Sequence, residues 1–141
     1  MAKRNTNKLT IIIGCGRLGA ELANSISDDN GDVIIIDNDK DSFRRLSFSF
    51  GGLATVGDGT DIDLLKASGI EKASTVAAVT DNENVNIMAA MMAKNLFNVK
   101  NVILRVNDNS KQELYKDSDI QVICPSELTS RAVKAMIDGG R

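Results

Sequence analysis

Three glycines in the segment GCGRLG have the spacing of a phosphate-binding turn. Gly14, Gly16 and Gly19 form the pattern G-x-G-x-x-G, directly after an apolar run and at the start of a helical pattern. The first glycine permits a tight turn, the second lets the backbone approach a pyrophosphate, and the third allows a helix to pack closely on a strand. Because the free N–H groups at a helix N-terminus attract phosphate oxygens, the segment predicts a nucleotide site.

An acid follows the turn at the distance that a ribose contact requires. Asp37 closes the apolar run DVIIID, roughly 18 residues after Gly19 and close to the ~20-residue spacing of an acid that binds ribose hydroxyls. A carboxylate at this position disfavours the 2′-phosphate of NADP. The alternative is a sheet turn whose glycines serve packing alone. The order of strand, turn, helix and acid favours nucleotide binding.

Arg17 is unusual inside such a turn, where small or apolar residues leave the phosphates unobstructed. Its guanidinium can clamp a phosphate through two charge-assisted hydrogen bonds. The alternative is a solvated surface arginine, which the positive end of the helix disfavours. Cys15 is interpreted as a small residue of the turn, and Cys124 as a buried side chain at a strand end. The chain has no histidine, which removes the commonest general base and metal ligand, so we predict no catalytic and no metal-binding residue.

Further polar residues follow the apolar runs. Asp58 comes after the third run, Thr80 and Asp81 after the fourth, and Arg105 ends the fifth. Ligands of open α/β sheets bind at the carboxyl ends of strands, so these residues are candidates for the site. Asp58 and Asp81 equally fit turn or helix-cap positions. A charge inside an apolar strand needs a partner, so Arg105 either contacts an anionic ligand or pairs with a nearby aspartate.

These residues must be positioned by alternating strands and helices. Short apolar runs occupy residues 9–13, 32–37, 52–56, 73–80, 101–106 and 120–124. Helical patterns occupy residues 17–26, 39–48, 61–67, 82–97, 110–116 and 126–140. Strands separated by single helices imply right-handed crossovers and a parallel, doubly wound sheet. The 141 residues carry a net charge of −2 and no apolar run of membrane-spanning length, so we expect one α/β domain that binds no nucleic acid.

Apolar positions at helical spacing indicate which helix faces are buried. In the longest helix they predict a buried stripe of Val85, Met88, Met92 and Leu96. In the last helix the apolar positions are Leu128, Val133 and Ile137, and Gly139 is expected to end the helix.

Five segments together resemble one known family. GCGRLG, IIIDND, VGDGTD, VAAVTDNENVNIMAAMMAK and VILRVND are similar to segments of the nucleotide-binding N-terminal domain of the Trk/Ktr potassium-uptake regulators, the RCK N-terminal or TrkA-N domain. The resemblance runs from about residue 9 to about residue 137. It implies a three-layer Rossmann-type doubly wound parallel sheet with strand order 3-2-1-4-5-6 and a C-terminal crossover helix. The implied boundaries are a flexible basic N-terminus at 1–8, the nucleotide-binding domain at 9–125, and the crossover helix with a hinge at 126–141. No second RCK C-terminal domain is expected in these residues.

The resemblance also implies a nucleotide site. Its residues are Gly14, Cys15, Gly16, Arg17, Leu18, Gly19, Asp37, Asn38, Asp58, Thr80, Asp81 and Arg105. The glycine turn and Arg17 would hold the phosphates, and Asp37 the adenosine ribose. Asp58 would border the adenine, Thr80 and Asp81 would line the cleft, and Arg105 would reach the ligand or an adjacent subunit. Many relatives place a glutamate directly after the proline that ends the sixth strand, whereas here a serine separates Pro125 from Glu127.

The function that the resemblance implies is regulatory. The ligand would be NAD(H) or ATP/ADP, bound as a regulator and not as a reactant. The protein would be a cytoplasmic homodimer, or a ring of four dimers, on the inner face of the membrane beneath a potassium channel or transporter. The alternative is the cofactor-binding domain of an NAD-dependent oxidoreductase. Arg17 and the lack of histidine count against this alternative, although the fold alone does not separate the two.

Overall fold

A computed structural model describes residues 8–139 of the chain. Residues 1–7 of the predicted flexible segment and residues 140 and 141 of the predicted hinge lie outside this range. The strands are β1 (Leu9–Ile13), β2 (Asp32–Asp37), β3 (Leu53–Val56), β4 (Ala73–Ala78), β5 (Asn101–Arg105) and β6 (Gln121–Ile123). All neighbours pair in parallel, in the order β3-β2-β1-β4-β5-β6. The predicted fold class and strand order are confirmed.

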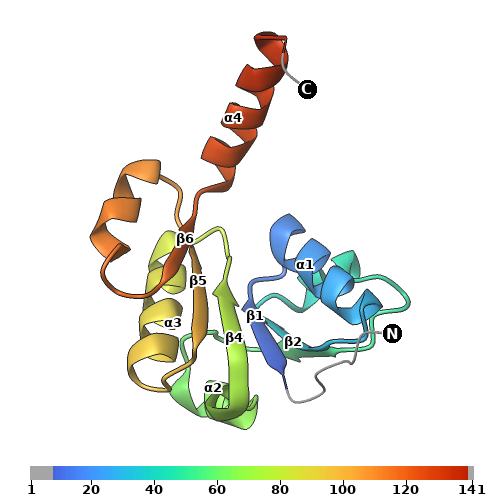
Figure 1. The fold of residues 1–141 in the computed structure, drawn as a ribbon. Helices are drawn as coiled ribbons and strands as arrows, with labels where there is room; N and C mark the ends of the chain where they lie inside the picture. Colours follow the sequence, from blue (N-terminus) through green and yellow to red (C-terminus); the bar gives the residue numbers. More distant parts are fainter. Residues whose placement is uncertain (1–7, 140–141) are drawn as a thin grey trace, which may run out of the picture.

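Helices cover both faces of this sheet. The α-helices are α1 (Arg17–Asp28), α2 (Ile62–Ala67), α3 (Glu83–Asn95) and α4 (Pro125–Ile137). Short 3₁₀ helices occupy η1 (Lys40–Arg45), η2 (Ile70–Lys72) and η3 (Asn109–Tyr115). Figure 1 shows α1 on one side of the sheet and α3 on the other, while α4 projects away from the sheet. None of the helices within residues 8–139 has both the length and the apolar character that crossing a bilayer demands.

The central strand β1 supplies side chains to two separate cores. Ile11 and Ile13 pack with α2 and α3 on one face, and Ile12 packs with α1 and η1 on the other. Successive side chains of a strand point to opposite faces, so an uninterrupted apolar run is what a strand covered on both faces requires. The turn that follows β1 is therefore anchored from both sides of the sheet.

The predicted buried stripe of α3 is wrong in part. Met92 is buried and Val85 is half-buried, but Met88 and Leu96 are 55% and 57% exposed. The buried residues of α3 are mostly small: they are Asn86, Ala89, Ala90, Met92 and Ala93. Two residues turn a helix by about 200°, so Met88 lies on the side opposite Asn86. The three alanines let the helix axis approach the sheet closely, which leaves Met88 on the exposed side of the helix.

Two other helical predictions differ from the structure in type. The segments predicted at 39–48 and 110–116 form the 3₁₀ helices η1 and η3, because short segments lack the length that stabilises an α-helix. In η1, Asp39 accepts a hydrogen bond from the N–H of Asp41 as the N-cap. Phe43 is partly buried against the core that contains Ala20 and Ala23 of α1.

The last helix has an exposed apolar face. Leu128, Val133, Met136 and Ile137 are 46–74% exposed, and no residue of α4 is buried in the described part of the chain. Gly139 has a positive φ of 85°, which confirms it as the stop of this helix. Cys124, directly before α4, is buried as predicted.

Candidate functional site

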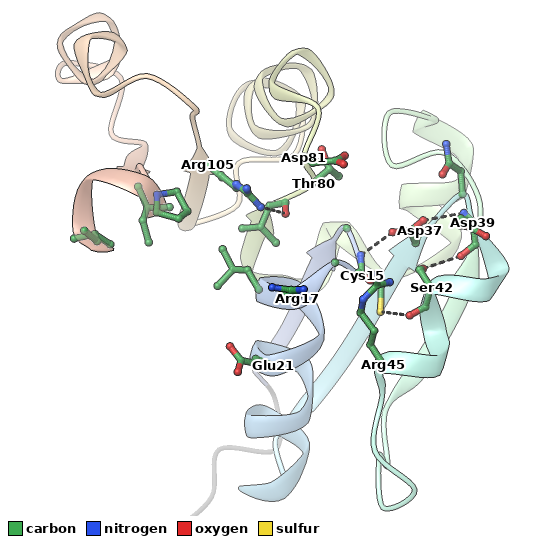
Figure 2. Close-up of a pocket in the computed structure, with 18 of the residues that line it drawn as sticks. Cys15, Arg17, Glu21, Asp37, Asp39, Ser42, Arg45, Thr80, Asp81 and Arg105 are labelled. Atoms are coloured by element: carbon green, nitrogen blue, oxygen red, sulfur yellow. Dashed lines mark hydrogen bonds between the residues drawn. The ribbon is translucent and has the colours of Figure 1, made fainter. Parts of the chain in front are cut away.

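A cavity of about 990 Å³ opens at the carboxyl ends of the strands, where the sheet order reverses between β1 and β4 (Figure 2). Side chains from both halves of the sheet line it, as expected for the switch point of a doubly wound fold. Among its lining residues are most of the predicted ones: Gly14, Cys15, Gly16, Arg17, Leu18, Asp37, Asn38, Thr80, Asp81 and Arg105. Gly19 and Asp58 do not line this cavity.

The three glycines occupy different environments. Gly14 has a φ of +110°, and a Cβ there would lie 2.8 Å from the backbone of Thr80. A Cβ at Gly19 would lie 1.8 Å from the carbonyl oxygen of Gly14, whereas a Cβ at Gly16 would meet no atom within 4 Å. Gly19 therefore lets α1 pack against the turn, and Gly16 leaves space open on the cavity side. These are the roles that the spacing predicts for the third and second glycines.

Asp37 is tied to the glycine turn. Its Oδ2 accepts a hydrogen bond from the N–H of Cys15 at 2.7 Å, and its Oδ1 accepts one from the N–H of Asp39 at 2.8 Å. A carboxylate offers about four lone-pair sites, so both oxygens can still accept bonds from a ligand. The backbone contacts thus fix the carboxylate at the edge of the cavity, with acceptor capacity left for hydroxyl groups.

Cys15 is part of the scaffold of the turn. Its side chain is fully buried, and its thiol donates to the carbonyl oxygen of Ser42 at 3.4 Å. Burial, with a smaller contribution from the charge of Asp37, raises the pKa of the Cys15 thiol. A buried thiol with a raised pKa fits the interpretation of Cys15 as a small residue of the turn.

The N-terminus of α1 faces the cavity with positive charge. Within residues 8–139, no side chain caps Gly16, and the first turn of α1 carries no acid. Arg17 begins the helix and is exposed to the cavity. A second guanidinium, that of Arg45, donates to the carbonyl oxygen of Cys15 at 3.4 Å from the other side of the turn. The free N–H groups and both arginines suit an anion.

Arg105 has no acidic partner among the described residues. Its Nη1 donates to the carbonyl oxygen of Val79 at 3.5 Å, and its Nε is buried without a hydrogen-bond partner within residues 8–139. The predicted alternative of an internal ion pair with an aspartate is therefore wrong. An unpaired guanidinium at a cavity wall is the arrangement that an anionic ligand would satisfy.

Asp58 lies in a second, smaller hollow beside the cavity. This hollow of about 240 Å³ shares Asp37, Asn38, Thr80 and Asp81 with the main cavity. Asp58 accepts hydrogen bonds from the N–H and hydroxyl of Thr60 at 2.8 and 2.7 Å, which lower the pKa of its carboxyl. The predicted turn role of Asp58 is thus confirmed, and its position allows a ligand to extend from the main cavity toward it.

Several cavity residues have no counterpart in the predicted set. They are Glu21, Asp39, Ser42, Arg45, Val79, Ile123, Pro125, Leu128 and Thr129. Glu21 lies one helical turn after Arg17 and could have been found from that spacing. Arg45 and the α4 residues give no sequence signal, because only the fold brings them to the turn. Glu127 pairs with Arg131 and does not line the cavity.

The six-stranded parallel sheet, with a glycine turn at its switch point, defines a Rossmann-type domain. The TrkA-N domain family matches residues 10–125, and the chain belongs to this family.

The matched relatives are potassium uptake proteins. The chain is 41% identical, over 120 residues, to the Trk system potassium uptake protein TrkA of Streptomyces coelicolor; the match covers 85% of the chain and 54% of the relative. It is 34% identical, over 107 residues, to a TrkA homologue of Pyrococcus horikoshii, covering 76% of the chain and 47% of the relative. The chain thus spans about half the length of these relatives.

Solved structures share the fold. The TrkA-N domain of the inner membrane protein ybaL from Escherichia coli superposes with a TM-score of 0.77 at 15% identity, covering 94% of this chain and 97% of that one. GsuK bound to ADP gives 0.78 at 21% identity, with coverages of 95% and 35%. The GsuK channel bound to NAD gives 0.70 at 18% identity, with coverages of 86% and 22%.

Proposed function

We propose that the cavity binds an adenine nucleotide, NAD(H) or ATP/ADP, as a regulatory ligand. One observation carries the proposal: the glycine turn, the Asp37 carboxylate and the unpaired guanidinium of Arg105 surround a single cavity. These groups complement the phosphate and ribose of a nucleotide. The GsuK structures bound to ADP and NAD share this fold and support the choice of ligand.

Each part of the ligand has a complementary group in this arrangement. The phosphates lie at the open side of Gly16, on the N–H groups of α1, and Arg17 adds positive charge. The ribose hydroxyls donate to Asp37, whose free lone pairs face the cavity. The adenine extends toward the hollow that contains Asp58. Arg105 contacts an anionic group of the ligand from the β5 side.

The chain then acts as the nucleotide sensor of a potassium uptake system. The names of its relatives support this function, and they favour it over the oxidoreductase alternative. The partner is a membrane-embedded potassium channel or transporter, contacted at the inner face of the membrane. Residues 9–125 form the nucleotide-binding domain, and residues 126–141 form the crossover helix and hinge. A nucleotide that fits one arrangement of the assembly better than another shifts the population toward it.

The exposed face of α4 supports a homodimer as the basic unit, with a ring of four dimers as the larger assembly. Leu128, Val133, Met136 and Ile137 form an apolar stripe that a second copy of the chain can cover. Leu128 also lines the cavity. Leu128 therefore contacts both the ligand in the cavity and the second copy of the chain. Through this residue, ligand binding changes the contact between the two copies.

Thermal stability measured with NAD, NADH, ADP and ATP tests the proposal. Each bound nucleotide raises the melting temperature, and adenosine without phosphates raises it less. A ligand at 100 times its Kd adds about 2.7 kcal/mol to the free energy of unfolding, which corresponds to a rise of roughly 5–10 °C for a domain of this size. An unchanged melting temperature with all four nucleotides contradicts nucleotide binding, and hydride exchange between NADH and a small substrate contradicts a purely regulatory role.

A further inference from the structure

Asn86 is a fully buried amide on the face of α3 that packs against the sheet. Its exposed fraction is 0%, and the other buried residues of α3 are three alanines and Met92. A buried amide in an apolar layer is unfavourable unless its polar atoms are paired. The contacts of Asn86 therefore indicate why an amide occupies this position.

All of the hydrogen-bonding capacity of the Asn86 side chain is used. Its Oδ1 accepts from the N–H of Thr80 at 2.8 Å and from the Thr80 hydroxyl at 2.6 Å. Its Nδ2 donates to the carbonyl oxygens of Thr80 at 2.9 Å and Arg105 at 3.1 Å. An amide can accept two bonds and donate two. Asn86 thus joins the ends of β4 and β5, and both residues that it holds line the cavity.

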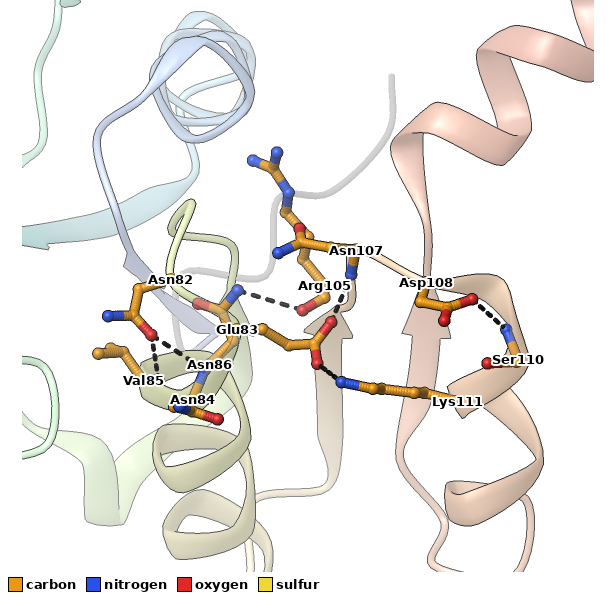
Figure 3. Close-up of polar contacts among 10 residues, drawn as sticks. All are labelled: Asn82, Glu83, Asn84, Val85, Asn86, Arg105, Asn107, Asp108, Ser110 and Lys111. Carbon is orange, nitrogen blue, oxygen red and sulfur yellow. Dashed lines mark hydrogen bonds and ion pairs between the residues drawn. The ribbon is translucent and has the colours of Figure 1, made fainter.

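A neighbouring contact holds the same end of β5 (Figure 3). Glu83, at the start of α3, accepts a hydrogen bond from the N–H of Asn107 at 2.6 Å and pairs with Lys111 through its other oxygen. The backbone is therefore attached to α3 at residue 105 and again at residue 107. The Glu83 side chain is partly buried, whereas Asn86 is fully buried on the face of α3 that packs against the sheet.

The side chain of Arg105 depends on this backbone attachment. Its only hydrogen bond among the described residues is the 3.5 Å contact to Val79, and its Nε has no partner there. No ion pair with a described acid fixes the guanidinium. Its direction is thus set by the backbone from which it extends, and Asn86 holds the carbonyl group of that residue.

We propose that Asn86 is a positioning residue for the nucleotide site: by joining the end of β5 to the end of β4, it fixes the direction in which the Arg105 guanidinium faces the cavity. This inference rests on the proposed function, since it gives Asn86 a role in binding the same ligand. Side chains that differ little in size do not replace it. An aspartate would set a carboxylate oxygen against the carbonyl groups of Thr80 and Arg105. A leucine would remove the partner of the Thr80 N–H and of both carbonyl groups.

A double-mutant cycle on ADP affinity tests the proposal. Asn86→Ala is expected to weaken ADP binding about tenfold, the equivalent of one lost charge-assisted contact. In an Arg105→Gln background the same change is expected to weaken binding less than about twofold, because there is no guanidinium left to position. Ala93→Gly, on the same buried face of α3, is the control: it lowers the melting temperature and leaves ADP affinity unchanged.

Equal losses in the two backgrounds overturn the proposal, as does an Asn86→Ala protein that is less stable but binds ADP normally. If Asn86→Ala does not fold, Asn86→Asp enters the same cycle, because it keeps the acceptor toward Thr80 and loses the donor to Arg105.

A ligand-free measurement separates this inference from the proposed function. In the wild-type protein the buried Nε–H of Arg105 is expected to exchange slowly with water in an NMR experiment. Asn86→Ala is expected to accelerate that exchange at least about tenfold, whereas Ala93→Gly does not. Unchanged exchange overturns the positioning role whether or not nucleotides bind. Absence of ADP binding to the wild-type protein, with accelerated exchange in the variant, contradicts the nucleotide function and leaves the positioning of Arg105 intact.

Discussion

Substitution of Gly19 by alanine separates the packing role of the glycine turn from its binding role. A Cβ at this position would lie 1.8 Å from the carbonyl oxygen of Gly14 and 3.5 Å from the side chain of Ile12. Atoms at optimal nonbonded separation are about 3.5 Å apart, so α1 must move away from the turn by roughly 1.5 Å. The obstructing atom belongs to the backbone of a turn with a positive φ, which cannot rotate aside as a side chain can.

The expected change in the free energy of unfolding of the Gly19→Ala protein follows from two opposing effects. Overpacking in a rigid layer lowers the free energy of unfolding by about 3 kcal/mol, at the upper end of its usual range. The better helix propensity of alanine returns about 1 kcal/mol. The net loss is about 2 kcal/mol, which lowers the melting temperature by roughly 4–8 °C in a domain of this size.

Gly16→Ala is the matched control at the next glycine of the turn. The added Cβ meets no protein atom within 4 Å, and the φ of −81° suits alanine. Alanine is a poorer N-cap than glycine by under about 1 kcal/mol, so the melting temperature is expected to fall by less than about 3 °C. The Cβ obstructs the phosphates and weakens ADP binding at least about tenfold. Differential scanning calorimetry and calorimetric titration measure both quantities. A Gly19→Ala protein as stable as the wild type, or a Gly16→Ala protein with unchanged ADP affinity, refutes this assignment of the two glycines.

Three further outcomes are expected. Arg17→Ala weakens ADP and ATP about tenfold and AMP less; equal losses measured by calorimetry would remove Arg17 from the terminal phosphates. Hydrogen bonds from Asn107 and Lys111 lower the pKa of Glu83, so its contribution to stability is present above the ordinary carboxyl pKa and is lost as the pH falls through the lowered value. Glu83→Gln therefore flattens the rise in melting temperature on the acid side of the ordinary carboxyl pKa, and an unchanged profile would show that the Glu83 contacts do not persist in solution. Ile137→Glu introduces charge into the apolar stripe of α4 and shifts the protein toward monomer in light scattering; a persistent dimer would exclude this stripe as the interface.

The sequence was sufficient to predict the sheet and the part of the site whose residues lie close together along the chain. Parallel strands buried on both faces appear as continuous apolar runs, and the turn, α1 and Asp37 lie within one contiguous segment. Spacing along the chain therefore determines their arrangement in space. The third glycine was assigned correctly because helix–strand packing at that position leaves no room for a side chain.

The remaining features depend on tertiary packing that spacing does not encode. Met88 fits the apolar period of α3 but is exposed, because alanines pack closer to the sheet. Asn86 was missed because an amide within a helix has no signature, and its partners lie at the ends of two different strands. The unpaired state of Arg105 could not be predicted, since several aspartates were near enough in the topology to pair with it.

An NMR titration of the amide N–H resonances with ADP tests most directly whether the cavity is a nucleotide site. The proposed function leads us to expect the largest shifts in the turn from Gly14 to Gly19, at Asp37 and Asn38, and at Thr80. Saturation is expected at one nucleotide per chain. Shifts that cluster away from these residues, or an unchanged spectrum at millimolar ADP, would contradict the nucleotide site.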